Sequence, residues 1–180
     1  PDTGRSSVKV SELPHGHLIP NRETVPVWWA PLAEVRDNET YGATVGFRSR
    51  YIHSILYMSE EQESAWHRVP PQAYLDTLNP VFDGVTVWGS RDGILLNYNE
   101  RLSLRNARVI GIAAPFQHNL GQTAATGVGV DFNNEATSGP GVIENVTIEG
   151  FEMGLLAPRQ GSWQVNNLAL GNVTDIMIHE

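Results

Sequence analysis

Four eight-residue segments of the chain share one pattern of apolar, polar and small residues. In each segment the first, fourth and sixth positions are apolar, and the third and eighth positions are Gly or Asn. The segments are Phe82–Gly89, Leu104–Gly111, Ile143–Gly150 and Val165–Asn172. Apolar residues that alternate over a few positions predict short β-strands rather than helices. Positions restricted to Gly and Asn predict bends, because these residues enter the left-handed backbone conformation at the lowest cost.

The segments recur with a period of 22 residues, which one insertion lengthens between the second and third segments. Their third positions, residues 84, 106, 145 and 167, are 22, 39 and 22 residues apart. A second apolar pair follows each segment: Ile94/Leu96, Val128/Val130, Leu155/Ala157 and Ile176/Ile178. Three strands separated by two bends complete one coil. The pattern therefore predicts an all-β protein, a right-handed parallel β-helix of four to five coils of about 22 residues each.

Stacked coils place equivalent side chains above one another, about 4.8 Å apart. The third positions then form a column of side-chain amides from Asn106, Asn145 and Asn167. We expect these amides to point inward and to hydrogen-bond from one coil to the next.

We divide the chain into an irregular N-terminal cap, residues 1–40, and the β-helix, residues 41–180. The β-helix carries insertions at about 58–80 and 112–125, where Pro, Gly and polar residues interrupt the pattern.

The two ends of the β-helix differ in their signals. Ala43–Phe47 mirrors Val85–Gly89 and predicts an earlier coil. Ile176–Glu180 stops directly after a coil strand, which would leave backbone groups unpaired along an edge. We therefore expect that this chain is cut from a longer protein, or that another chain pairs there.

Composition excludes several classes of function. The 180 residues include no Cys, 12 Lys and Arg, and 20 Asp and Glu, for a net charge of −8. Cysteine zinc sites and thiol nucleophiles are thereby excluded. The negative charge argues against nucleic-acid and anionic-membrane partners. The chain also has no apolar run of roughly 18 residues, the length that a membrane helix needs.

The stretch IENVTIEGFEMGLL, Ile143–Leu156, resembles the repeat of the pectate-lyase-like superfamily of right-handed parallel β-helix proteins. That resemblance implies an extracellular or cell-surface protein that binds or processes a polysaccharide on its coil face. The enzymes of the superfamily include lyases, glycoside hydrolases and epimerases, and its other members are surface proteins. Whether this chain is an enzyme, or a non-catalytic structural or adhesion segment of a larger protein, stays open at this point.

The resemblance also suggests catalytic residues on the outer side of the third strands. Carboxylates there hold Ca²⁺ in pectate-lyase-like enzymes, which implies Asp131 and Glu135 as calcium ligands or acid–base groups. His118 lies in the second insertion and is a candidate general acid or base. Further candidates bind the substrate: Asn97, Asn133, Arg159, Trp88 and Trp163.

The two tryptophans of that set are candidates because sugar rings stack on exposed indoles. We expect Trp88 and Trp163 to point outward, next to inward Val87 and Val165. A separate, minor hypothesis is a metal site at His15 and His17, because two residues at i and i+2 of an extended segment face the same side.

Overall fold

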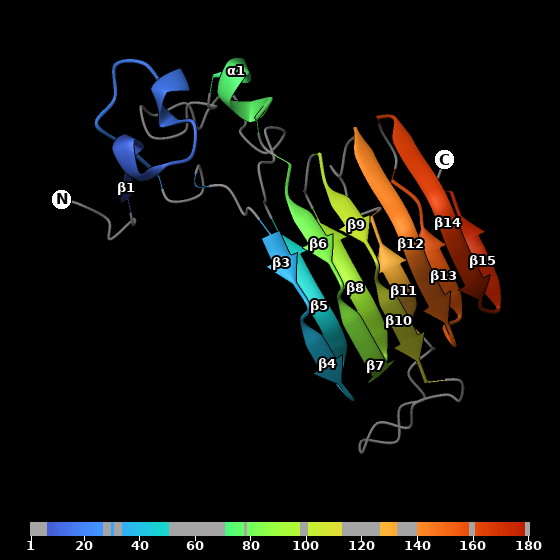
Figure 1. The fold of residues 1–180 in the computed structure, drawn as a ribbon. Helices are drawn as coiled ribbons and strands as arrows, with labels where there is room; N and C mark the ends of the chain where they lie inside the picture. The colour runs from blue at the N-terminus through green and yellow to red at the C-terminus, as the bar shows by residue number, and fades with distance from the viewer. Residues whose placement is uncertain are drawn as a thin grey trace, which may run out of the picture.

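The protein is described from a computed structural model and is mostly β, with two parallel sheets and very little helix (Figure 1). The all-β class is therefore confirmed. The structure describes residues 7–26, 30, 34–50, 71–77, 79–97, 101–112, 127–132, 140–158 and 161–178. Within these ranges we find no helix that is long and apolar enough to cross a membrane.

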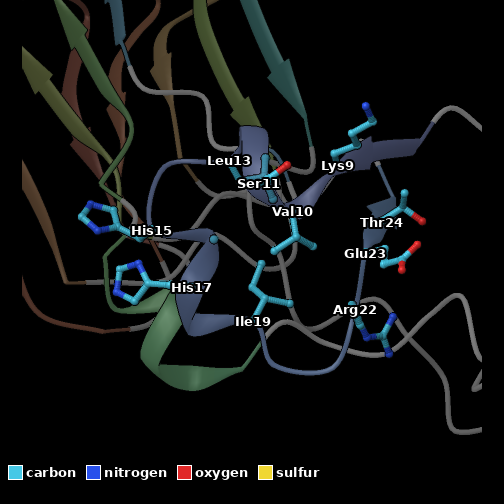
Figure 2. A pocket seen from close by; sticks show the side chains of 11 residues that line it. Lys9, Val10, Ser11, Leu13, His15, His17, Ile19, Arg22, Glu23 and Thr24 are labelled. Carbon is cyan, nitrogen blue, oxygen red and sulfur yellow. The ribbon is translucent and has the colours of Figure 1, made fainter.

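A small N-terminal unit lies apart from the parallel sheets at the upper left of Figure 1. It contains the antiparallel strands β1 (Ser7–Lys9) and β2 (Thr24–Pro26). Three short helices complete it: η1 (Val10–Glu12), η2 (Gly16–Leu18) and α1 (Gln72–Leu75). Its core is a separate cluster of buried residues: Val10, Leu13, Ile19, Val25 and Tyr74. A pocket of roughly 790 Å³ opens in this unit (Figure 2).

The rest of the described chain builds two parallel sheets, and the chain visits them in alternation. The first sheet contains β3 (Glu34–Arg36), β4 (Glu39–Tyr41), β6 (Val81–Asp83), β7 (Thr86–Ser90), β9 (Ser103–Arg105), β10 (Arg108–Gly111), β12 (Gly141–Glu149) and β14 (Trp163–Gly171). The second sheet contains β5 (Val45–Arg50), β8 (Asp92–Asn97), β11 (Val128–Asp131), β13 (Met153–Leu156) and β15 (Thr174–Met177).

Strands that follow one another along the chain lie at the same level of both sheets, and we call each such set a layer. Layer 1 is β3–β5, layer 2 is β6–β8, layer 3 is β9–β11, layer 4 is β12–β13 and layer 5 is β14–β15. Neighbouring layers pair in parallel in the first sheet, with Phe82, Leu104, Ile143 and Val165 in one continuous register. The predicted alignment of the four segments is therefore confirmed.

The predicted position of the earliest layer is wrong. Thr40 pairs with Val87 and Phe47 pairs with Ile94, so Ala43–Phe47 is not equivalent to Val85–Gly89. The equivalent segment begins at β3 instead, seven residues before the predicted boundary at residue 41. Its third position is Asp37, whose φ of 51° is left-handed. Sequence reasoning missed the segment because it accepted only Gly and Asn at that position.

The second sheet has a register that differs by two residues from the predicted one in layer 3. Val130, rather than Val128, pairs with Ile94 and with Leu155. The shift follows from a column of glycines that precedes these apolar residues, Gly46, Gly93, Gly129 and Gly154. A Cβ on Gly93 would lie 2.1 Å from the carbonyl oxygen of Gly129 on the neighbouring strand and 2.4 Å from Val109 of the first sheet. Only a residue without a side chain lets the two sheets approach this closely.

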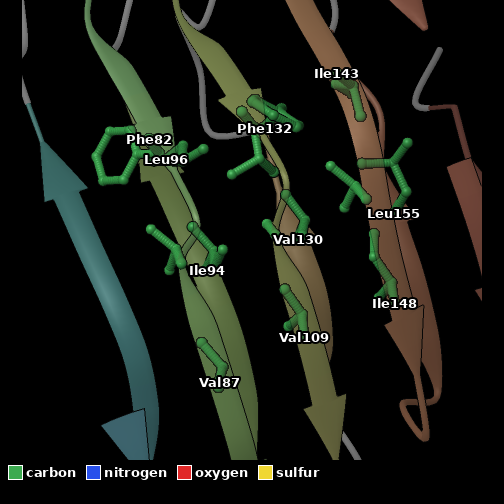
Figure 3. Close-up of a cluster of buried hydrophobic side chains, with 14 of the residues drawn as sticks. Phe82, Val87, Ile94, Leu96, Val109, Val130, Phe132, Ile143, Ile148 and Leu155 are labelled. Atoms are coloured by element: carbon green, nitrogen blue, oxygen red, sulfur yellow. The ribbon is translucent and has the colours of Figure 1, made fainter. Parts of the chain in front are cut away.

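The main core lies between the two parallel sheets and consists of stacked columns of apolar side chains (Figure 3). One column of the first sheet contains Val87, Val109 and Ile148, each with 0% exposure. A column of the second sheet contains Ile94 and Val130, which are equally buried. Each of these side chains is covered by its neighbours in the layers above and below, which is how repeated layers bury a continuous core.

The amide column exists, but it lies on the surface. The Nδ2 of Asn145 donates to the Oδ1 of Asn106 at 3.1 Å, and the Nδ2 of Asn167 donates to the Oδ1 of Asn145 at 2.9 Å. All three residues are exposed, with φ between 50° and 53°. The inward orientation predicted for them is wrong, because the left-handed residue interrupts the strand alternation. The second and third positions of each segment therefore both face outward, and the first and fourth positions face inward.

Candidate functional site

The outer face of the first sheet carries an aromatic pair at the end of β4 and β7. Val87 is fully buried, so its neighbour Trp88 points to the opposite, outer side of the sheet. Tyr41 is the register partner of Trp88 in layer 1, and its side chain faces the same way. Tyr41 is 68% exposed, the highest exposure of any large apolar or aromatic side chain in layers 1 to 4 of the described chain.

Polar contacts fix both aromatic rings. The indole Nε1 of Trp88 donates a hydrogen bond to the Oε1 of Glu39 at 2.7 Å. The phenol of Tyr41 also hydrogen-bonds to Glu39, and this contact raises the pKa of Tyr41 above its usual range. Glu39 stands two residues before Tyr41 on the same strand, so the strand alternation itself brings the carboxylate to the outer face.

A cation completes the cluster from the next layer. The guanidinium carbon of Arg108 lies 4.5 Å from the centre of the Trp88 ring, a cation–π arrangement. Arg108 pairs in register with Thr86, which places it diagonally across from Trp88. We call Glu39, Tyr41, Trp88 and Arg108 the aromatic patch. It combines flat apolar ring surface with a carboxylate acceptor and guanidinium donors, the groups that recognise a polyhydroxylated ligand.

Sequence reasoning identified Trp88 but missed the other three members of the patch. Their outward positions follow from the register once Asp37 is accepted as a third position. Tyr41 then precedes Gly42 as Trp88 precedes Gly89, and both glycines have left-handed φ values, 56° and 60°.

Asp131 lies on the outer face of the second sheet, because its chain neighbours Val130 and Phe132 are both fully buried. Its register partners are Leu95 in layer 2 and Leu156 in layer 4. The substrate-binding candidate Asn97 lies two residues beyond Leu95 on β8, so it is not the register partner of Asp131.

The other residues predicted around Asp131 lie outside the described residues. These are His118, Glu135, Asn133 and Arg159. A calcium or acid–base role for Asp131 together with these residues therefore stays a prediction.

Trp163 does not point outward as predicted. Its ring packs against Phe132, with the ring centres 4.8 Å apart, and it contacts the main core. The space it fills is left by Gly141, where a Cβ would lie 2.4 Å from the indole. The reason is periodicity: Trp163 and Val165 are two residues apart on one strand and therefore share a face.

His15 and His17 lie in the N-terminal unit and line its pocket. The segment is not extended as predicted, since His15 has a φ of 56° and His17 belongs to η2. The two imidazole rings are 6.2 Å apart, edge to face. They occupy one side of the pocket, and Arg22 and Glu23 occupy the other (Figure 2). Nowhere in the described ranges do three or more His, Asp or Glu side chains gather as a metal site would require.

Comparison with known proteins identifies no relative. No family model, no curated protein and no solved structure matches this chain. The aromatic patch therefore stands on its geometry alone.

Proposed function

We propose that layers 1 to 5 wind as a right-handed parallel β-helix of five coils, and that this β-helix is an extracellular module that binds a polysaccharide. The continuous parallel register and the alternation of the chain between two sheets support the first part. The handedness follows from the rule that crossovers between parallel strands are right-handed. The resemblance of Ile143–Leu156 to a carbohydrate-related repeat supports the second part.

The observation that carries the binding proposal is the aromatic patch. Tyr41 is exposed and its register partner Trp88 is half-buried on the outer face of the first sheet. Glu39 hydrogen-bonds to both rings, and Arg108 lies over Trp88. A ring platform fixed before binding loses little conformational entropy when a sugar stacks on it. The net charge of −8 also favours a neutral or weakly charged chain of sugars over a polyanion.

A binding experiment with matched variants tests this proposal. The protein is screened against neutral and uronic-acid polysaccharides, and each hit is quantified by calorimetry. We expect Trp88→Ala and Tyr41→Ala to weaken binding about five- to thirtyfold, the effect of removing an aromatic anchor. Glu149→Ala is the control, because Glu149 is exposed in the column of Trp88 but lies two layers away.

The results separate binding from mere destabilisation. Circular dichroism must show that each variant keeps the β spectrum of the parent. Binding that survives both aromatic substitutions, or the absence of binding to every polysaccharide, contradicts the proposal. An ultraviolet assay for unsaturated uronate then decides whether Asp131 and Ca²⁺ support a lyase reaction, by comparison of the parent with Asp131→Asn.

A second candidate function is a non-catalytic structural or adhesion segment of a larger assembly. The observation that favours it is the regular stack of parallel layers, an architecture that carries no catalytic chemistry by itself. A stable protein that binds no polysaccharide would favour this function over the first.

A further inference from the structure

A row of outward positions at the start of the first sheet changes from covered to open. Ser103 faces outward, because its chain neighbours Leu102 and Leu104 both belong to the main core. Its register partner in layer 4, Val142, faces the same way. Ser103 is nevertheless only 1% exposed, whereas Val142 is half-buried. The outer face is therefore covered over Ser103 and left open over Val142.

The cover is a cluster of polar side chains. Asn79 precedes β6, and its Oδ1 accepts a hydrogen bond from the Oγ of Ser103 at 3.3 Å. Arg101 precedes β9, and its Nη2 donates to the Oδ1 of Asp76 at 2.6 Å. Asp76 directly follows α1, so the chain between α1 and β6 contributes to this cluster. Beside the cluster, a cavity of about 300 Å³ opens over Val142.

The size and direction of this cavity limit what can occupy it. Its volume lies at the lower end of the range for ligand sites, so it has room for one ring rather than for a segment of a polymer. Pro140 and Ser162, which precede β12 and β14, complete its lining. The cavity opens on the outer face of the sheet and not along the stack of layers. A further layer beyond layer 5 would therefore not fill it.

Arg101 has an unusual backbone conformation at this cavity. Its φ of 55° is left-handed, and five of the six other non-glycine residues with this conformation in the described chain are Asn or Asp. Those short side chains tolerate the left-handed region, whereas arginine gains nothing there. Backbone strain of this kind is concentrated at ligand sites. The guanidinium makes its one hydrogen bond within the described ranges to Asp76, so the other N–H groups of its fork are available to a ligand.

We propose that this cavity binds a single sugar residue, either a free monosaccharide or the end of a sugar chain. Neighbouring hydroxyls of a sugar ring need donors and acceptors side by side, and the Arg101 guanidinium donates where the Asp76 carboxylate accepts. The C–H face of the ring packs on Val142. Because the ion pair is neutral as a whole, the ligand is a neutral sugar rather than an acidic one.

This site is separate from the aromatic patch. The cavity lies where β9 and β12 begin, whereas Tyr41 and Trp88 lie towards the ends of β4 and β7. The proposal therefore does not rest on binding at the aromatic patch, and variants can test the two sites independently.

Titration of the isotope-labelled full chain, followed by amide chemical shifts, tests the proposal. The probes are the methyl glycosides of glucose, galactose, mannose and xylose, with glucuronic acid as the acidic comparison. We expect saturable shifts at residues 101–103 and 141–142 with at least one neutral probe. Oligosaccharides of that sugar then separate the two sources: tighter binding at the same amides identifies a chain end, and equal affinity identifies the free sugar.

Variants of the protein locate the binding. Arg101→Gly removes the guanidinium, and we expect it to weaken binding at least about tenfold, as for the loss of hydrogen bonds from a charged group. Its thermal midpoint should not fall, because glycine adopts the left-handed conformation without strain. Val142→Phe fills the cavity from its floor and should abolish binding while the ion pair stays intact. Arg36→Ala, at an exposed arginine that pairs with Glu34 on the same sheet, is the matched control. It should bind as the parent does, and so should Trp88→Ala.

Three outcomes overturn the proposal. The first is the absence of a saturable shift with every neutral probe, or a shift with glucuronic acid alone. The second is parent-like binding by both Arg101→Gly and Val142→Phe. The third is binding that is lost in Trp88→Ala and kept in the two cavity variants, because the sugar would then occupy the aromatic patch alone.

Discussion

Layers 4 and 5 have nearly the same pattern of residue types, yet one is buried and the other is open. Ile143, Val146 and Ile148 of β12 are at most 2% exposed. Their register partners on β14 are Val165, Leu168 and Leu170, which are apolar but only partly buried or exposed. The difference does not come from the side chains but from the number of neighbouring layers. Burial in this protein is therefore a property of the stack, as in other repeat architectures.

The largest difference between the two layers should appear when equivalent apolar side chains are truncated. Ile148 is covered on both sides, so we expect Ile148→Ala to lower the free energy of unfolding by about 2–5 kcal/mol. Leu170 is covered on one side, and Leu170→Ala should cost about 1 kcal/mol. Urea denaturation followed by circular dichroism measures both values. Equal losses would show that layer 5 is covered in solution.

A smaller difference is expected for added methyl groups at two glycines. Gly93 lies in an inner layer, where a Cβ would lie 2.4 Å from Val109 of the first sheet, so Gly93→Ala should destabilise by about 1–3 kcal/mol. Gly171 lies in layer 5, where the nearest atom to a Cβ is the flexible side chain of Glu149 at 3.4 Å. Gly171→Ala should change the thermal midpoint very little. A large loss at Gly171, or none at Gly93, would contradict the described approach of the sheets.

The amide column gives a still smaller contrast. Asn145 makes two column hydrogen bonds and Asn167 makes one. Glycine keeps the left-handed backbone at both positions, so the substitutions remove only the side-chain bonds. We expect Asn145→Gly to cost about 1 kcal/mol, because its bonds are exposed to water, and Asn167→Gly to cost roughly half of that. If chemical denaturation shows a larger loss of stability for Asn167→Gly than for Asn145→Gly, the hydrogen-bonded column is contradicted.

The smallest expected effect is a titration in the aromatic patch. Hydrogen bonding to Glu39 raises the pKa of Tyr41, so the contact stabilises the neutral phenol. Its contribution to stability is present below the usual tyrosine pKa and is lost as the pH rises through the raised value. Glu39→Gln removes the charge and should lower the pKa of Tyr41 toward its usual range, as measured by ultraviolet absorbance. If Tyr41 has the same pKa in the parent and in the variant, the hydrogen bond between Tyr41 and Glu39 is contradicted.

The sequence predicted the elements whose signal is local and repeated. Apolar alternation placed the strands of layers 2 to 5, and the restriction of the third position to Gly and Asn identified left-handed corners that the structure contains. It failed where one residue departs from the repeat. Asp37 adopts the same left-handed backbone as Asn106, because a short polar side chain tolerates that conformation, but a pattern of Gly and Asn alone does not include it.

The candidate site was harder to predict because it depends on register between distant segments. Glu39, Tyr41 and Arg108 gather around Trp88 only once layers 1 and 3 are aligned with layer 2. A shift of two residues, as at Val130, preserves the strand alternation and therefore leaves no trace in the apolar pattern. The glycine column that causes the shift acts through contacts between the two sheets, which periodicity within one strand does not report.

The central claim is that residues far apart in sequence lie in one vertical column. Since the chain has no cysteine, spin labels can be attached at introduced pairs, Arg36→Cys with Asn166→Cys and Arg48→Cys with Met177→Cys. Each pair spans four register steps, one pair in each parallel sheet. Double electron–electron resonance measures the distance between the two labels of a pair. For both pairs this distance should be narrowly distributed around a backbone separation of about 19 Å, four spacings of about 4.8 Å. Broad distributions, or distances that differ greatly between the two pairs, would contradict the stacked arrangement.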